Sequence, residues 1–180
     1  MDDLIKHAMI DWETFSLRKN AMLLCVGVVI FDKATECINK QVWHLDLTEQ
    51  KRLGRDIDPE TVIWWMQQSK AAQEIVFGTR FEPVNRVPIS KFLFELKEFL
   101  FWNDVSRVWS KGPSADAAWL EDLASDMELP CPVHYRDHRD VRTIIDGKEL
   151  PEIDQSDIVP HDPISDCIAQ VREVRAAWLS

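Results

Sequence analysis

The chain has 180 residues, of which 46% are hydrophobic and 29% charged, as in a folded globular protein rather than a disordered one. This length fits one domain, which we expect to comprise residues 1–180. The formal net charge of −10 argues against a protein that wraps duplex DNA through a broad basic face, although it leaves open an enzyme that admits a single strand end.

The N-terminus and the apolar segments predict a protein without a membrane segment. The acidic start Met1-Asp2-Asp3 lacks the basic region of a signal peptide. The longest apolar run, residues 21–31, has 11 residues and is too short to span a bilayer. The four cysteines are scattered, without paired or zinc-finger spacing. We therefore expect a cytoplasmic protein with reduced thiols.

The first part of the chain predicts three strands. Residues 7–13 form a short strand that ends in acidic residues, and the apolar run 21–31 forms the second strand after a polar connection. Residues 37–47 follow a turn and alternate enough to form the third strand. Short connections between consecutive strands favour antiparallel pairing, so we expect a meander.

The remainder of the chain predicts mainly helices. Asp58-Pro59 is typical of a helix start, with an N-cap residue followed by proline. That helix ends near residue 68, a short helix follows over 69–77, and residues 78–87 form a loop. Further helices are predicted over 89–101, 115–127, 140–145 and 163–179, and further strands over 105–110 and from Val133. This order predicts an α/β fold with a mixed five-stranded sheet and helices on its faces.

An acidic pair, Asp11 and Glu13, closes the first strand. Residues i and i+2 of a strand point to the same face, about 6.5–7 Å apart along the chain. Two carboxylates placed in this way bind one hard cation together or bridge two cations. A pair of solvent-facing acids on an edge strand is the ordinary alternative, and the D-x-E pattern alone does not separate the two.

Three more candidates lie at the starts of helices. Asp116 follows the fourth strand in the first turn of the next helix, where a carboxylate also stabilises the helix N-terminus without any metal. Asp166 has the same place in the C-terminal helix, and His161 precedes that helix in a loop. An ordinary imidazole can take a proton from water near pH 7. Glu121 and Asp122 compete with Asp116 but stand farther from the end of the strand.

The ordered set of motifs resembles the DEDDh exonucleases of the DnaQ-like or ribonuclease T-like superfamily. Their motifs are D-x-E, an acid at a strand–helix junction, and H-x-x-x-x-D. Long segments resemble a subgroup that includes T-even phage exodeoxyribonuclease and a mycobacterial 3′–5′ exoribonuclease: residues 9–32, 57–69, 108–116 and 135–143. The resemblance extends from His7 to Trp178 and implies a ribonuclease H-like fold.

The resemblance implies a 3′–5′ exonuclease that releases nucleoside 5′-monophosphates from single-stranded DNA or RNA 3′ ends. Asp11, Glu13 and Asp166 would ligate one divalent ion, Asp11 and Asp116 would act on a second, and His161 would be the general base. Mg²⁺ or Mn²⁺ is favoured over zinc because the ligands are carboxylates, without a cluster of Cys or His. Dimers are common in related enzymes, so a homodimer is a further expectation.

The loop after the first strand carries the candidates for substrate contact. Phe15 and Leu17 either stack beside the terminal base or pack beneath the loop, and Thr14 can hydrogen-bond the terminal 3′-hydroxyl. Of the adjacent Trp64 and Trp65, we expect Trp65 to lie in the core. A basic run either meets phosphates or forms a solvated face: Arg136, His138, Arg139 and Arg142.

Two other functions remain open at this point. One is a catalytically silent ribonuclease H-like module that binds nucleic acid or a protein partner, against which the five filled catalytic positions count. The other is a phosphoesterase that acts on a short or free nucleotide. The sequence also does not distinguish a ribose from a deoxyribose substrate.

Overall fold

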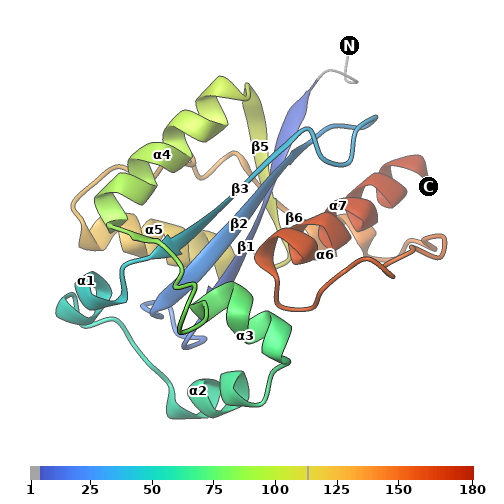
Figure 1. Cartoon of the computed structure of the whole chain (residues 1–180). Coiled ribbons are helices and arrows are strands. Elements are labelled where there is room, and N and C mark those ends of the chain that lie inside the picture. Colours follow the sequence, from blue (N-terminus) through green and yellow to red (C-terminus); the bar gives the residue numbers. More distant parts are fainter. Residues whose placement is uncertain (1–4, 113) are drawn as a thin grey trace.

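A mixed sheet runs through the molecule in the strand order β4-β3-β2-β1-β5-β6, as Figure 1 shows for the computed structural model. The structure describes residues 5–112 and 114–180. The strands are β1 (Lys6–Thr14), β2 (Leu23–Phe31), β3 (Asn39–Leu45), β4 (Arg86–Val87), β5 (Val105–Ser110) and β6 (His138–Asp140). The helices are α1 (Leu47–Arg52), α2 (Pro59–Met66), α3 (Lys70–Phe77), α4 (Ile89–Trp102), α5 (Asp116–Asp126), α6 (Val141–Ile145) and α7 (Pro163–Leu179).

The sheet joins an antiparallel meander to parallel strands. β1, β2 and β3 pair antiparallel in chain order, as predicted, whereas β5 pairs parallel to β1 and β6 pairs parallel to β5. Helices α4 and α5 pack on one face, and α6 and α7 pack on the other (Figure 1). All nine residues of β2 are buried because helices cover both of its faces. This is the α/β arrangement predicted from the sequence.

Three details differ from the prediction. The sheet has six strands rather than five in the described residues, since β4 pairs with the end of β3 inside the predicted loop 78–87. The strand predicted from Val133 is wrong: Val133 is a buried core residue in an irregular segment, and the strand is β6. The third strand ends at Leu45, and α1 follows it directly. A two-residue strand is too short to show a periodic pattern.

The starts of α2 and α7 follow the capping rules. Asp58 accepts a hydrogen bond from the backbone N–H of Glu60 at the start of α2, with proline as the first helical residue. Asp162 caps α7 in the same way, accepting from the N–H of Ile164 ahead of a proline. No helix in the described part of the chain is long and apolar enough to cross a membrane.

Gly27 lets α7 approach the sheet closely. It lies opposite Asp11 in the pairing of β1 with β2, and a Cβ on it would come within 2.4 Å of the carbonyl oxygen of Pro163. One turn further along α7, the thiol of Cys167 donates to the carbonyl oxygens of Met9 and Gly27. The start of α7 is thereby held against β1 and β2, beside the acidic pair of β1.

Candidate active site

The five predicted catalytic residues come from three parts of the fold. Asp11 and Glu13 stand on β1, on the face that α7 covers, and Asp116 is the first residue of α5. Asp166 lies in the first turn of α7, and His161 lies in the loop just before that helix. The structure therefore brings together residues that are up to 155 positions apart in the chain.

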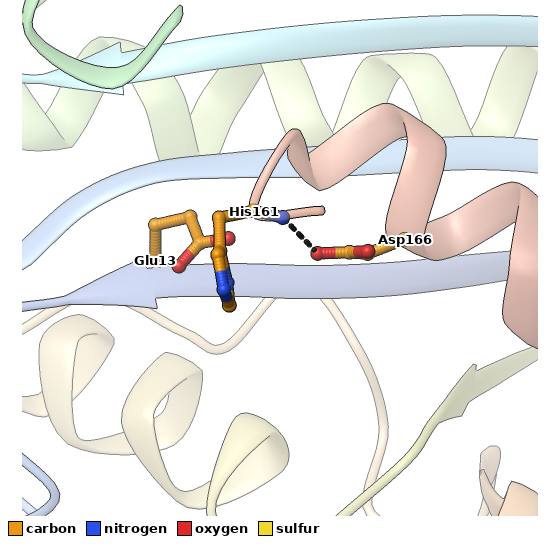
Figure 2. A group of neighbouring side chains, drawn as sticks. All are labelled: Glu13, His161 and Asp166. Atoms are coloured by element: carbon orange, nitrogen blue, oxygen red, sulfur yellow. Dashed lines mark hydrogen bonds between the residues drawn. The ribbon is translucent and has the colours of Figure 1, made fainter. Parts of the chain in front are cut away.

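Glu13, His161 and Asp166 form the centre of this cluster. Each offers one ligand atom, and these three atoms lie within 4.8 Å of one another. Figure 2 shows the side chain of His161 beside the carboxylate of Glu13, with Asp166 joined to the backbone nitrogen of His161. The backbone N–H of His161 also donates to Oδ2 of Asp166 over 3.0 Å, which ties the loop to the helix. Two carboxylates at this spacing can hold a divalent cation, with the imidazole of His161 beside them.

Asp11 belongs to the same acidic group and is held by a residue of α7. Its Oδ1 accepts a hydrogen bond of 2.7 Å from Nε2 of Gln170. Burial raises the pKa of Asp11 well above its ordinary value, and the nearby charges of Asp116 and Asp166 raise it further. Lys111 and the Gln170 hydrogen bond act in the opposite direction. The charge of Asp11 thus interacts with the two acids at helix starts, Asp116 and Asp166.

Glu13 is a buried carboxyl group with a strongly raised pKa. Burial raises its pKa to about 9, with further contributions from Asp11, Asp166, Asp162 and Asp116. Its Oε1 is buried without a hydrogen-bond partner in the described structure. A buried carboxylate oxygen without a partner is costly unless a proton or a cation satisfies it. The site is therefore suited to a bound metal ion.

Asp116 lies at the junction of β5 and α5. Burial raises its pKa to about 7, although a hydrogen bond from the side chain of Ser110 opposes this effect. Its backbone N–H donates to the carbonyl oxygen of Gly112 over 3.0 Å, which closes the loop between strand and helix. Glu121, the competing acid, is exposed farther along α5. Asp122 instead pairs with Lys19 and Arg55. The competitors therefore lie outside the cluster.

Two tryptophans of α2 pack near His161. Trp65 is 2% exposed and donates from Nε1 to the carbonyl oxygen of Thr14, in agreement with its predicted place in the core. Trp64 is half-exposed, and its ring meets the His161 ring edge-on at 4.8 Å between centroids. His161 has a φ of 65°, in the left-handed region that non-glycine residues seldom adopt. The backbone and the tryptophan together fix where the imidazole points.

The three candidates for substrate contact have different surroundings. The hydroxyl of Thr14 is buried and donates to the carbonyl oxygen of Ser16. Phe15 is half-buried and stacks on Phe77 at 5.8 Å, which favours the packing interpretation for this ring. Leu17 is 81% exposed. The loop thus presents Leu17 to solvent and rests on Phe15.

Sequence reasoning missed Gln170 and Lys111 as neighbours of the acids. Gln170 stands four residues after Asp166, so helical spacing places it on the same side of α7. Lys111 extends from the end of β5 and pairs with Glu173 at 2.6 Å, and its charge lowers the pKa of Asp11 and Asp166. The spacing of Gln170 was a usable signal, whereas the position of Lys111 depends on how the sheet packs.

A family model for the Rv2179c-like 3′–5′ exoribonuclease domain matches residues 6–178. The chain belongs to this family. None of the curated proteins compared with the chain matches it. The motifs predicted a member of the DnaQ-like superfamily, and the family assignment confirms this prediction.

Solved structures with the same fold include exonucleases. The nuclease domain of 3′hExo, a DEDDh family member bound to rAMP, is 10% identical, with a TM-score of 0.63 over 99% of this chain and 94% of that chain. Escherichia coli exonuclease I in complex with a dT13 oligonucleotide is 12% identical, with a TM-score of 0.61 over 96% of this chain. Exonuclease I from Methylocaldum szegediense is 13% identical, with a TM-score of 0.63 over 95% of this chain. The chain spans 40% of the length of these two exonuclease I chains. At such identities the likeness establishes the fold, which is the ribonuclease H-like arrangement predicted.

Proposed function

We propose that the chain is a metal-dependent 3′–5′ exonuclease that shortens single-stranded DNA or RNA and releases nucleoside 5′-monophosphates. The observation that carries the proposal is the convergence of Glu13, His161 and Asp166, whose ligand atoms lie within 4.8 Å of one another. The family assignment over residues 6–178 supports this reaction and supports one exonuclease domain over residues 1–180.

Exonucleases of this family depend on divalent metal ions, and we propose two ions, Mg²⁺ or Mn²⁺, for this chain. Asp11, Glu13 and Asp166 would hold one ion, and Asp11 with Asp116 would hold the other. The carboxylate ligands favour hard cations, and the partnerless Oε1 of Glu13 fits a metal ligand. When bound, such ions acidify water and stabilise the charge that develops on the phosphate and on the leaving oxygen.

His161 serves as the general base in this proposal. One of its ring nitrogens lies within the cluster, and the ring is oriented by Trp64 and by the backbone hydrogen bond to Asp166. The imidazole takes a proton from the water that attacks the terminal phosphorus. The bond from phosphorus to the 3′-oxygen of the preceding nucleotide breaks, and this oxygen takes up a proton from solvent water. The shortened strand then ends in a 3′-hydroxyl, and the released nucleotide keeps its 5′-phosphate.

The loop after β1 would receive the terminal nucleotide. Leu17 is exposed and is the side chain available to press against the base, while Phe15 supports the loop from beneath through Phe77. We assign Thr14 to the 3′-hydroxyl through its backbone or hydroxyl oxygen. The hydroxyl already donates to Ser16, so its oxygen is the atom that can accept a further hydrogen bond.

The test is a time course on 5′-labelled single-stranded DNA and RNA with Mg²⁺, Mn²⁺ or EDTA. We expect a ladder that shortens from the 3′ end and requires metal. Asp11→Asn and His161→Ala should lose the activity, whereas Glu121→Gln, an exposed acid on the same helix as Asp116, should keep it. The chain length of the products separates this activity from a phosphoesterase for short or free nucleotides.

If the substrate stays intact under every metal condition while nucleic-acid binding is still measurable, the chain is a silent binding module and not an enzyme. Both sugars belong in the assay because the matched family is named for exoribonucleases, whereas one structural relative holds a DNA oligonucleotide. The relative rates on the two strands then define the sugar preference.

Two finer properties belong to the same proposal. All four cysteines are free thiols, so we place the enzyme in a reducing compartment such as the cytoplasm. We also expect a homodimer, for which the exposed aromatic side chains of α4 provide apolar surface: Phe94, Phe101 and Trp102. Light scattering during size-exclusion chromatography measures the oligomeric state directly.

A further inference from the structure

A pocket of about 520 Å³ lies at the other end of β1 from the candidate active site. None of the proposed catalytic residues lines it. The starts of β1 and β5, the strand β6 and the last turn of α7 contribute its walls: His7, Ser106, Arg107, Trp109, Arg139 and Trp178. Its volume lies within the range of small-molecule pockets, about 300–1,000 Å³. We call it the distal pocket.

The short length of α6 explains why this part of the sheet is open. α6 has five residues and begins directly after β6, at the active-site end. It therefore extends about 7 Å along the sheet and leaves the starts of β5 and β6 uncovered. Asp166 and Trp178 stand twelve residues apart on α7, so about 18 Å of helix separates the candidate active site from the distal pocket.

Aromatic rings form one wall of the distal pocket. Trp178 stacks on Phe31 at 5.8 Å and meets Trp109 edge-on at 5.9 Å. Trp109 donates from Nε1 to Nδ1 of His7 over 3.2 Å, and the His7 ring lies 5.1 Å from that of Trp178. Because an indole nitrogen only donates, Nδ1 of His7 accepts, and the neutral ring carries its proton on Nε2. The wall is thus aromatic, and the His7 ring adds one hydrogen-bond donor.

Two arginines of the neighbouring strands also line the distal pocket, and their strand partners are His7 and Trp109. Arg107 pairs with Asp137 at 3.0 Å, and NH1 of Arg139 donates to the carbonyl oxygens of Arg136 and His138. No carboxylate of the described residues lies within ion-pair distance of Arg139, in a chain whose net charge is −10.

The two arginines also affect the pKa of His7. Burial lowers the pKa of His7 to about 4, and the charges of Arg107 and Arg139 contribute, against an opposing effect of Asp32. Arg107 and Arg139 thus place positive charge at the lining of the distal pocket, which favours an anion.

We propose that the distal pocket binds a nucleotide, with the base against the aromatic wall and the phosphate at Arg139 and Arg107. Aromatic side chains next to cations are the usual elements of sequence-tolerant binding to single nucleotides and single strands. The biological meaning rests on the proposed function. The nucleotide is then either an upstream unit of the strand whose 3′ end is at Glu13 and Asp166, or the released nucleoside 5′-monophosphate.

The first measurement is calorimetric binding of adenosine 5′-monophosphate in EDTA, so that turnover plays no part. Arg139→Glu reverses the charge in the pocket, and Arg52→Glu makes the same change on α1, at an exposed residue outside it. We expect binding by the wild type and Arg52→Glu, and at least tenfold weaker binding by Arg139→Glu. Trp178→Phe retains packing on Phe31 and should weaken binding less than the charge reversal. Equal affinity in the wild type and Arg139→Glu overturns the proposal.

The second measurement distinguishes the two sources of the nucleotide. If the strand itself occupies the pocket, Arg139→Glu should raise KM at least tenfold more for a fifteen-nucleotide strand than for a trinucleotide. If the released product occupies it, the variant should instead lose inhibition by adenosine 5′-monophosphate, with the two KM values changed alike. An inactive protein that still binds the nucleotide through Arg139 contradicts the proposed function and not the pocket. An active enzyme that Arg139→Glu leaves unchanged in both measurements contradicts the pocket alone.

Discussion

The backbone N–H of His161 donates to Oδ2 of Asp166 over 3.0 Å, while the His161 backbone has a φ of 65°. The hydrogen bond joins the loop that carries the proposed base to the helix that carries a proposed metal ligand. A left-handed backbone costs a non-glycine residue about 1–2 kcal/mol. The loop is therefore held in a strained conformation that aims the imidazole at Glu13.

Replacing His161 by glycine should lower the activity strongly and change the stability little. Glycine relieves the backbone strain and loses the ring contact with Trp64, so we expect the free energy of unfolding in urea to change by less than about 1 kcal/mol. Loss of the general base should lower kcat by about 10²–10⁴-fold. Glu128→Gly is the matched control, since Glu128 also has a positive φ, 55°, at the end of α5. Wild-type kcat in His161→Gly would show that this residue is not the base.

Gln170 should position Asp11 for metal binding. Its Nε2 donates to Asp11 over 2.7 Å, and its own Oε1 is buried without a partner. We expect Gln170→Leu to weaken Mn²⁺ binding about 10–100-fold in calorimetry, because partners that orient metal ligands contribute that much. Stability should change little, since the substitution also removes the partnerless oxygen. Gln41→Leu, at an exposed residue of β3, is the control, and equal Mn²⁺ affinity in Gln170→Leu and the wild type contradicts the role.

Gly27→Ala should displace the start of α7 and so disturb the candidate active site. A Cβ would meet the carbonyl oxygen of Pro163 at 2.4 Å, so the start of α7 must shift. Forced expansion in a packed region costs about 1–3 kcal/mol, which unfolding in urea measures, and kcat should fall because Asp166 moves with the helix. Gly54→Ala is strained only by its φ of 74° and has no neighbour within 4 Å. The control should lose about 1 kcal/mol and keep its kcat. An unchanged kcat in Gly27→Ala would show that the active site does not depend on the contact between Gly27 and Pro163.

Most of the fold and the order of the acids were predictable, because they depend on local patterns. Alternation along β1 placed Asp11 and Glu13 on one face, and the capping residues Asp58 and Asp162 marked two helix starts. The strand predicted from Val133 failed because an apolar residue in an irregular segment looks like one in a strand. The contacts of His161 with Trp64 and of Gln170 with Asp11 join segments about 100 or more residues apart, so only the packed structure reveals them.

The metal-free protein should lose stability as the pH rises. The pKa of Glu13 is about 9 in the fold against an ordinary 4.5, and that of Asp116 is about 7 against 3.8. The folded state therefore binds more protons than the unfolded state within these windows, and deprotonation disfavours it. A pKa raised by one unit corresponds to about 1.4 kcal/mol, or about 3–6 °C in Tm for a chain of this size.

We expect Tm in EDTA to fall by more than about 4 °C between pH 6 and pH 9. Mn²⁺ should restore it most at the alkaline end, because bound metal requires deprotonated carboxylates. Glu13→Gln should flatten the dependence, and Glu121→Gln should leave it as in the wild type. A Tm in EDTA that rises over this range would contradict the raised pKa values of Glu13 and Asp116.

The most direct test of the central claim is the anomalous diffraction of Mn²⁺ in crystals of the wild-type protein. The same preparation should first be shown to shorten a labelled strand from its 3′ end with Mn²⁺. We expect anomalous density between the carboxylates of Asp11, Glu13 and Asp166. A protein that degrades the strand with Mn²⁺ but shows density only elsewhere would contradict the assignment of the catalytic site to this cluster.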